Sequence, residues 1–149
     1  MNRTILAAAL GALACGASVA APLDHFKGKV KPGMYETKME MTIPGMPAGM
    51  GKQNMTFKNC VTQQDIDQGQ VGKTDGMPKD CEIKNLKSSG NTTSYTMVCK
   101  GERPMTADNT ITFRGDGYTM DMKMAMTQGG QAMNMQQKMD SRYVGPCTK

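Results

Sequence analysis

The sequence has very few of the side chains on which most catalytic and metal centres depend. It contains no tryptophan and one histidine, His25, and only 5% of its residues are aromatic. Serine and cysteine nucleophiles usually need a histidine as general base, and zinc centres need closely spaced cysteine or histidine ligands, which are missing here. His25 precedes the predicted strands, where we expect a solvated tail. We therefore expect no enzymatic activity and no resident cofactor.

Long hydrophobic runs are also missing, apart from residues 5–13. That run follows Arg3 and is too short to span a bilayer, so it predicts a secretory signal peptide. Small residues up to Ala20 fit a cleavage site, which makes residues 1–20 the signal peptide and residues 21–149 a single domain. Lipoprotein processing at Cys15 is the alternative. The sequence thus predicts a periplasmic or secreted protein without a transmembrane segment.

Positive charge is present but is not concentrated in one region. The chain carries 18 lysine and arginine residues against 13 aspartate and glutamate residues, which gives a formal net charge of +5. The basic residues are dispersed along the sequence, as is typical of a solvated surface. We therefore expect no nucleic-acid partner.

The cysteines form an even set once Cys15 is removed with the signal peptide or acylated. The four that remain are Cys60, Cys81, Cys99 and Cys147. An even number of cysteines in a small exported domain indicates two disulfides, with no free thiol left for redox or nucleophilic chemistry. Four cysteines allow three different pairings.

Turn geometry favours one of these pairings. A Ser-Gly-Asn turn signal surrounds Gly90, and a hairpin folded about this glycine places Cys81 opposite Cys99. The same register predicts that Asn85 faces Tyr95. The two predicted disulfides are therefore Cys81–Cys99 and Cys60–Cys147.

Alternating apolar and polar side chains predict strands along most of the chain. In residues 34–43, Tyr35 and every second residue after it share one face, while Glu36 begins a charged face. Gly-rich turns separate the later segments, as short hairpins require. The predicted strands are residues 34–43, 53–60, 81–88, 92–100, 109–113, 118–127 and 131–143. Thr62 starts the predicted helix, because it can cap a first turn that contains Asp65.

Seven short strands with mostly neighbouring connections define the expected fold class. We predict an all-β domain built as a single curved antiparallel meander, barrel-like or half-barrel, with one short helix. The Gly- and Pro-rich residues 44–51 are predicted to form a loop.

Short motifs spread over most of the chain carry a resemblance to a known family. The motifs are Pro32-Gly33-Met34-Tyr35-Glu36, Cys60-Val61-Thr62, Asp80-Cys81, Met97-Val98-Cys99, Gly115-Asp116-Gly117-Tyr118 and Gly145-Pro146-Cys147. Their order and spacing resemble a bacterial exported family catalogued as domain of unknown function 3617. This resemblance implies a periplasmic or lipoprotein setting and an all-β domain. It supplies no activity and no catalytic residues.

Methionine is the residue that the chain has in excess, with 17 in total. Six of them recur at every second position on either side of a Gly-Gly turn, and these are Met120, Met122, Met124, Met126, Met133 and Met135. Side chains alternate between the two faces of a strand, so all six are predicted to lie on one face of two paired strands.

This methionine stripe supports four interpretations. Methionine can fill an irregular core, or it can line an apolar face that accepts varied hydrophobic shapes. Thioethers are also soft ligands that suit Cu(I) and Ag(I), and exposed thioethers can scavenge oxidants. We predict a non-enzymatic protein that binds a hydrophobic small molecule or protein partner through a Met-lined concave face. The alternative is a periplasmic Cu(I)- or Ag(I)-binding protein that uses Met46, Met50, Met122 and Met124.

Overall fold

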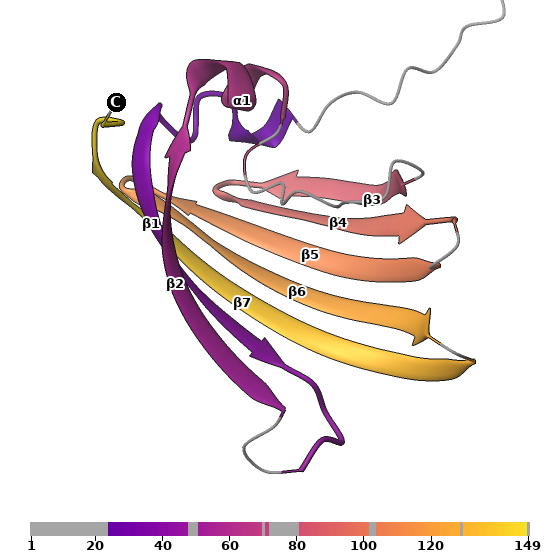
Figure 1. The fold of residues 1–149 in the computed structure, drawn as a ribbon. Helices are drawn as coiled ribbons and strands as arrows, with labels where there is room; N and C mark the ends of the chain where they lie inside the picture. The colour runs from indigo at the N-terminus through magenta and orange to yellow at the C-terminus, as the bar shows by residue number, and fades with distance from the viewer. Residues whose placement is uncertain are drawn as a thin grey trace, which may run out of the picture.

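The computed structural model describes residues 24–47, 51–69, 71, 81–101, 104–128 and 130–148. Seven strands, one short α-helix and one turn of 3₁₀-helix make up its regular structure (Figure 1). The elements are η1 (Asp24–Phe26), β1 (Gly33–Thr42), β2 (Lys52–Val61), α1 (Gln63–Asp67), β3 (Cys81–Ser89), β4 (Thr92–Cys99), β5 (Met105–Arg114), β6 (Gly117–Gln128) and β7 (Gln131–Gly145).

All seven strands belong to one antiparallel sheet, in the order β2-β1-β7-β6-β5-β4-β3. The last five strands follow one another as a meander, and the β1–β2 hairpin extends the sheet by pairing with β7. The predicted all-β fold class is therefore confirmed. The sheet is curved but does not close into a barrel, because β2 and β3 remain its two edges (Figure 1).

The sheet has one apolar face and one polar face, as the alternation in the sequence predicts. Residues that lie directly opposite one another in neighbouring strands point to the same face. One such row across the apolar face contains Met55, Met39, Met139, Met120, Ile111 and Thr93. The neighbouring row on the polar face contains Thr56, Lys38, Asp140, Thr119 and Thr112.

Two short helices cover one end of the apolar face (Figure 1). Phe26 of η1 is only 1% exposed, and its ring centroid lies 5.4 Å from that of Phe113 and 5.5 Å from that of Tyr118. Both ring pairs are edge-to-face, which is a favourable arrangement of aromatic quadrupoles. Ile66 of α1 is also buried. Phe26 and Ile66 thus join the two short helices to the core.

The expectation of a solvated tail around His25 is wrong. The His25 ring is partly buried, and its centroid lies 5.6 Å from that of Tyr95. Its neighbour Phe26 is inserted into the core and holds this segment against the sheet. Phe26 anchors this segment together with Val30, which packs against the core, and with Lys29, whose Nζ lies 4.8 Å from the Phe113 ring centroid.

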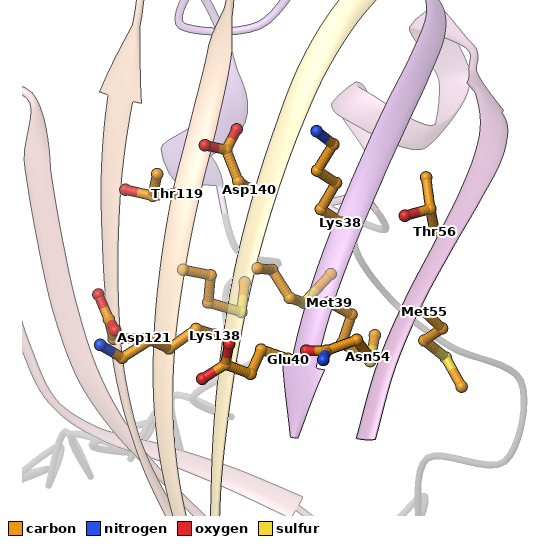
Figure 2. Close-up of a pocket in the computed structure, with 12 residues that line it drawn as sticks. Lys38, Met39, Glu40, Asn54, Met55, Thr56, Thr119, Asp121, Lys138 and Asp140 are labelled. Carbon is orange, nitrogen blue, oxygen red and sulfur yellow. The ribbon is translucent and has the colours of Figure 1, made fainter. Parts of the chain in front are cut away.

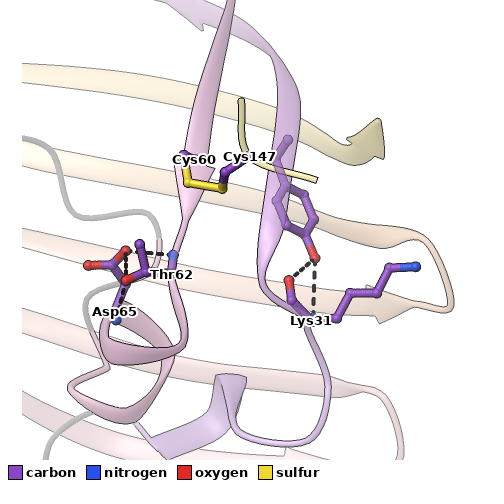
Figure 3. The surroundings of a disulfide bond; sticks show 6 residues. Lys31, Cys60, Thr62, Asp65 and Cys147 are labelled. Carbon is purple, nitrogen blue, oxygen red and sulfur yellow. Dashed lines mark hydrogen bonds between the residues drawn. A yellow bond between two sulfur atoms is a disulfide. The ribbon is translucent and has the colours of Figure 1, made fainter. Parts of the chain in front are cut away.

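The predicted capping of α1 is confirmed. The Thr62 hydroxyl accepts a hydrogen bond from the Asp65 backbone N–H at 3.1 Å, and Oδ2 of Asp65 accepts one from the Thr62 N–H at 2.8 Å (Figure 3). This capping box satisfies two N–H groups that a helix start leaves unpaired. It allows a helix of only five residues to form between β2 and β3.

Both predicted disulfides are present in the structure. Cys60 at the end of β2 is joined to Cys147 beyond β7, and Cys81 is joined to Cys99 across the β3–β4 hairpin (Figure 3 shows the first). Disulfides are typical of proteins that fold in an oxidising compartment. Within the described residues, no helix is long and apolar enough to cross a membrane.

The predicted pairing of Asn85 with Tyr95 is wrong. The β3–β4 register shifts between Lys84 and Lys87, and Asn85 has a positive φ of 54°. Next to the turn, Ser89 lies opposite Thr92, which is one residue out of the predicted register. The irregularity then restores the predicted register, so that Cys81 lies opposite Cys99. An asparagine tolerates this left-handed backbone better than most residues do.

Strand β5 is longer than the sequence predicted, because it begins at Met105 rather than at Asn109. Aspartate and asparagine are depleted in strands, so the Asp108-Asn109 pair has a low local strand preference. In the structure Asn109 is buried, and its side-chain amide donates a hydrogen bond to the Ala107 carbonyl at 3.0 Å. Pairing with both neighbouring strands therefore overrides the local preference.

Candidate functional site

The methionine stripe of β6 and β7 changes from core to surface along its length. Met120 is 6% exposed and Met139, directly opposite it, is 7% exposed. From these two residues towards the β6–β7 turn the methionines become half-buried. We define the methionine surface as the half-buried methionines of this end of the apolar face, namely Met41, Met105, Met122, Met124, Met126, Met133 and Met135.

Cross-strand pairing brings most of the predicted site residues together. Met124 lies opposite Met135 and Met126 lies opposite Met133, so four of the six predicted thioethers form two direct pairs. Side chains in such pairs are typically about 5 Å apart at Cβ, which is close enough for contact. The remaining two residues differ, because Met120 belongs to the core and Met122 has Asn109 and Gln137 as its cross-strand partners.

The structure adds Met105 and Met41 to this surface. Met105 lies opposite Met126, and Met41 lies opposite Gln137. Met105 was missed because β5 was predicted to begin four residues later. The signal that could have found it is the alternation of Met105 and Ala107 with polar neighbours, which continues the pattern of the predicted strand backwards.

Three of the four residues of the alternative metal site fall within the described part of the chain, and they lie on two different segments. Met46 is 47% exposed and lies in the loop between β1 and β2, while Met122 and Met124 lie on β6. Met50 lies outside the described residues. The alternative metal site therefore stays a prediction.

The short helices leave the methionine surface uncovered in the described part of the chain. Figure 1 shows α1 and η1 at the end of the sheet where β1 begins, away from the turn that joins β6 to β7. The aromatic part of the core lies beneath these helices, and the core continues along β4 and β5 to Met97, Cys99 and Ala107, against which Met105, Met122 and Met124 pack. The other end of the same apolar face is thus a surface of flexible thioethers, which can repack around varied apolar shapes.

The opposite, polar face carries a shallow groove of about 550 Å³ (Figure 2). Its lining consists of two rows of polar side chains and the row of methionines between them, and comprises Lys38, Met39, Glu40, Asn54, Met55, Thr56, Thr119, Met120, Asp121, Lys138, Met139 and Asp140. The apolar-face neighbours of these methionines, such as Met41 and Tyr118, do not line it. The groove therefore opens on the polar face, with the backbone of the methionine row as its floor.

Several charged side chains of this polar face form ion pairs with one another. The Arg114 guanidinium donates to Asp140 at 2.7 Å, and Nε of Arg142 donates to the same carboxylate at 3.3 Å. The Arg114 hydrogen bond, reinforced by Arg142, holds the pKa of Asp140 below its usual range. Lys52 and Lys58 of the edge strand β2 pair with Glu40 and Glu36 of β1. These paired charges support a structural role for the polar face.

Chemistry based on ionisable clusters has little support in the described residues. They contain no group of three or more histidine, cysteine, aspartate or glutamate side chains that could hold a metal ion. The tyrosines of the core are also poor acids, because burial raises the pKa of Tyr95 and of Tyr118. The methionine surface is therefore the best candidate for a functional site.

Comparison with known proteins gives one match. The family model described as "Protein of unknown function (DUF3617)" matches residues 30–147, which is most of the chain. No curated protein and no solved structure matches the chain significantly.

Proposed function

From the premise that this chain belongs to the DUF3617 family of proteins of unknown function, we propose that it is a non-enzymatic protein that binds a hydrophobic small molecule on its methionine surface. One observation carries the proposal. The apolar face of a single sheet is covered by Phe26 and the short helices at one end and carries half-buried methionines at the other, beside the buried Ala107 and Cys99. Apolar surface left in water is a source of binding free energy, at roughly 25 cal/mol for each Å² that a ligand covers.

The residue type at this surface favours a ligand with a flexible apolar chain. Methionine is unbranched and adapts to irregular shapes, whereas the branched side chains of leucine or valine would give the surface a more rigid shape. The surface extends over four neighbouring strands, with Met41 on β1, Met133 on β7, Met126 on β6 and Met105 on β5. An acyl chain laid across these strands would contact several thioethers at once.

The proposed setting is an oxidising compartment outside the cytoplasm, either the periplasm or the extracellular medium. Two disulfides support it, since such bonds persist where thiols are not kept reduced. The signal peptide predicted over residues 1–20 and the lipid-anchored alternative at Cys15 lie outside the described residues.

Replacing Met124 and Met135 by glutamine tests the proposed site. We expect the double variant to bind a dansyl-labelled undecanoic acid at least about tenfold more weakly than the natural chain, because two polar amides replace two apolar contacts. Dansyl fluorescence in a direct titration measures this affinity. The double variant should unfold at nearly the same denaturant concentration, since neither side chain is fully buried.

Ala125 provides the matched control, because it lies between Met124 and Met126 but on the polar face. Ala125→Gln should leave the affinity for the probe unchanged. Equal binding by the natural chain and the Met124/Met135 variant would contradict the proposal, as would failure of the natural chain to bind. Native mass spectrometry of the purified protein then shows whether the occupant is a small molecule or an apolar segment of a partner protein.

A further inference from the structure

A single row of sulfur-containing side chains crosses five neighbouring strands at one end of the apolar face. Strand pairing places Cys81 opposite Cys99, Cys99 opposite Met105, Met105 opposite Met126, and Met126 opposite Met133. We call these five residues the sulfur row. No alternation within one strand reveals it, since each strand from β3 to β7 contributes one member.

The sulfur row provides three free thioethers side by side. Cys81 and Cys99 are joined in a disulfide, which leaves Met105, Met126 and Met133 on three consecutive strands. All three are half-buried, so their sulfurs are neither sealed in the core nor on a loose loop. The next row, about 7 Å away along the strands, adds the direct pair of Met124 and Met135.

The geometry of neighbouring strands allows these three sulfurs to meet at one point. Directly opposite side chains lie about 5 Å apart at Cβ, and methionine has three rotatable bonds that can bring its sulfur towards a shared position. Met126 is the central member because it lies opposite both Met105 and Met133. Strands hold these positions more rigidly than a loop would, which reduces the cost of assembling a binding site.

The chemistry of this donor set selects a narrow class of ions. Thioethers are soft and uncharged, so they bind monovalent soft cations and offer little to zinc or calcium ions, which prefer imidazole, thiolate or oxygen ligands. The described residues hold no group of three or more histidine, cysteine, aspartate or glutamate side chains that would compete for the ion.

We propose that Met105, Met126 and Met133 bind one Cu(I) or Ag(I) ion through their three thioether sulfurs. This site differs from the combination of Met46, Met50, Met122 and Met124 expected from the sequence. It is independent of the binding of a hydrophobic molecule, because it depends on sulfur as a donor rather than on apolar area.

Ag(I) is the first probe, since it resembles Cu(I) as a soft monovalent ion and needs no added reductant. It is titrated into the full, disulfide-bonded protein carrying isotope-labelled methionine methyl groups, and the methyl resonances are followed by NMR. We expect the methyl groups of Met105, Met126 and Met133 to shift together and to saturate at one ion per chain. Shifts confined to other methionines, or no saturable shift at all, would overturn the assignment.

A triple variant separates sulfur ligation from apolar character. Met105→Leu/Met126→Leu/Met133→Leu keeps the surface apolar and removes the donors, so its affinity for Cu(I) should fall by more than roughly 100-fold, the upper range for losing supporting groups around a metal. Competition with a chromophoric Cu(I) chelator measures this change. The matched control is Met41→Leu/Met46→Leu/Met55→Leu, which replaces three methionines outside the sulfur row and should retain the natural affinity.

The two proposals on this face can fail separately. The Met105/Met126/Met133 leucine variant should still bind dansyl-labelled undecanoic acid, because leucine is as apolar as methionine. Unchanged Cu(I) affinity in this variant would refute the metal site and leave the hydrophobic site standing. Loss of probe binding in the Met124/Met135 glutamine variant concerns only the hydrophobic site.

Discussion

Replacing Cys60 and Cys147 together by serine is expected to lower the free energy of unfolding by about 4–5 kcal/mol. The two residues are 87 positions apart, so their disulfide closes a loop that spans more than half of the chain. In the loop-entropy account, a cross-link stabilises by restricting the unfolded chain, and a longer loop gives a larger effect. Equilibrium unfolding in denaturant, monitored by circular dichroism, measures the change.

The second disulfide provides the comparison. Cys81 and Cys99 are only 18 positions apart and already face each other in a hairpin, so Cys81→Ser/Cys99→Ser should cost less, about 3 kcal/mol. The order of the two effects is the diagnostic result. The proposed role of the Cys60–Cys147 bond in holding the two halves of the chain together would be contradicted by either of two results. One is a larger loss of unfolding free energy for the hairpin disulfide, and the other is a loss below about 1 kcal/mol for the Cys60–Cys147 bond.

Replacing Phe26 by alanine is expected to destabilise the protein by about 3–5 kcal/mol. The ring is 1% exposed and packs edge-to-face against Phe113 and Tyr118, so truncation leaves a cavity under η1 and removes two aromatic contacts. Denaturant unfolding measures the loss. The same variant should also loosen the segment that carries His25.

Phe57 is the matched control, because it undergoes the same truncation at a position that is 36% exposed on the edge strand β2. Phe57→Ala should cost less than about 1.5 kcal/mol, since less apolar area leaves a packed environment. Equal losses at Phe26 and Phe57 would mean that the 3₁₀-helix is not part of the core.

The sequence predicted those parts of the fold that follow from local periodicity. Alternation assigned the two faces of β1, β6 and β7, because side chains of a strand alternate strictly between its faces. The turn at Gly90 and the parity of the cysteines predicted both disulfides, since a hairpin brings its two ends together. The capping pair Thr62 and Asp65 located the helix, because its hydrogen bonds are local.

Features that depend on distant parts of the chain were not predictable from the sequence. Phe26 lies in a polar segment, and only the aromatic residues of β5 and β6 make it a core residue. The irregularity at Asn85 arises because the register at the turn and the register at the Cys81–Cys99 pair differ by one residue. The sulfur row is assembled by the registers of five strands, which no single strand pattern contains.

Periodicity also could not decide whether the methionine stripe lines a core or a surface, because both cases give the same alternation. The structure divides the stripe between the two. Met120 lies between Met139 and Ile111 in the core, while the methionines nearer the β6–β7 turn are half-buried. Both proposed binding functions depend on this division.

Methionine oxidation footprinting tests that division most directly. Brief exposure of the folded protein to a low dose of hydrogen peroxide, followed by peptide mass spectrometry, gives an oxidation rate for each methionine. We expect Met124, Met126, Met133 and Met135 to oxidise well before Met120 and Met139, because the former are half-buried and the latter are at most 7% exposed. Equal protection of all six would contradict this division of the stripe, since the methionine surface would then be closed to solvent.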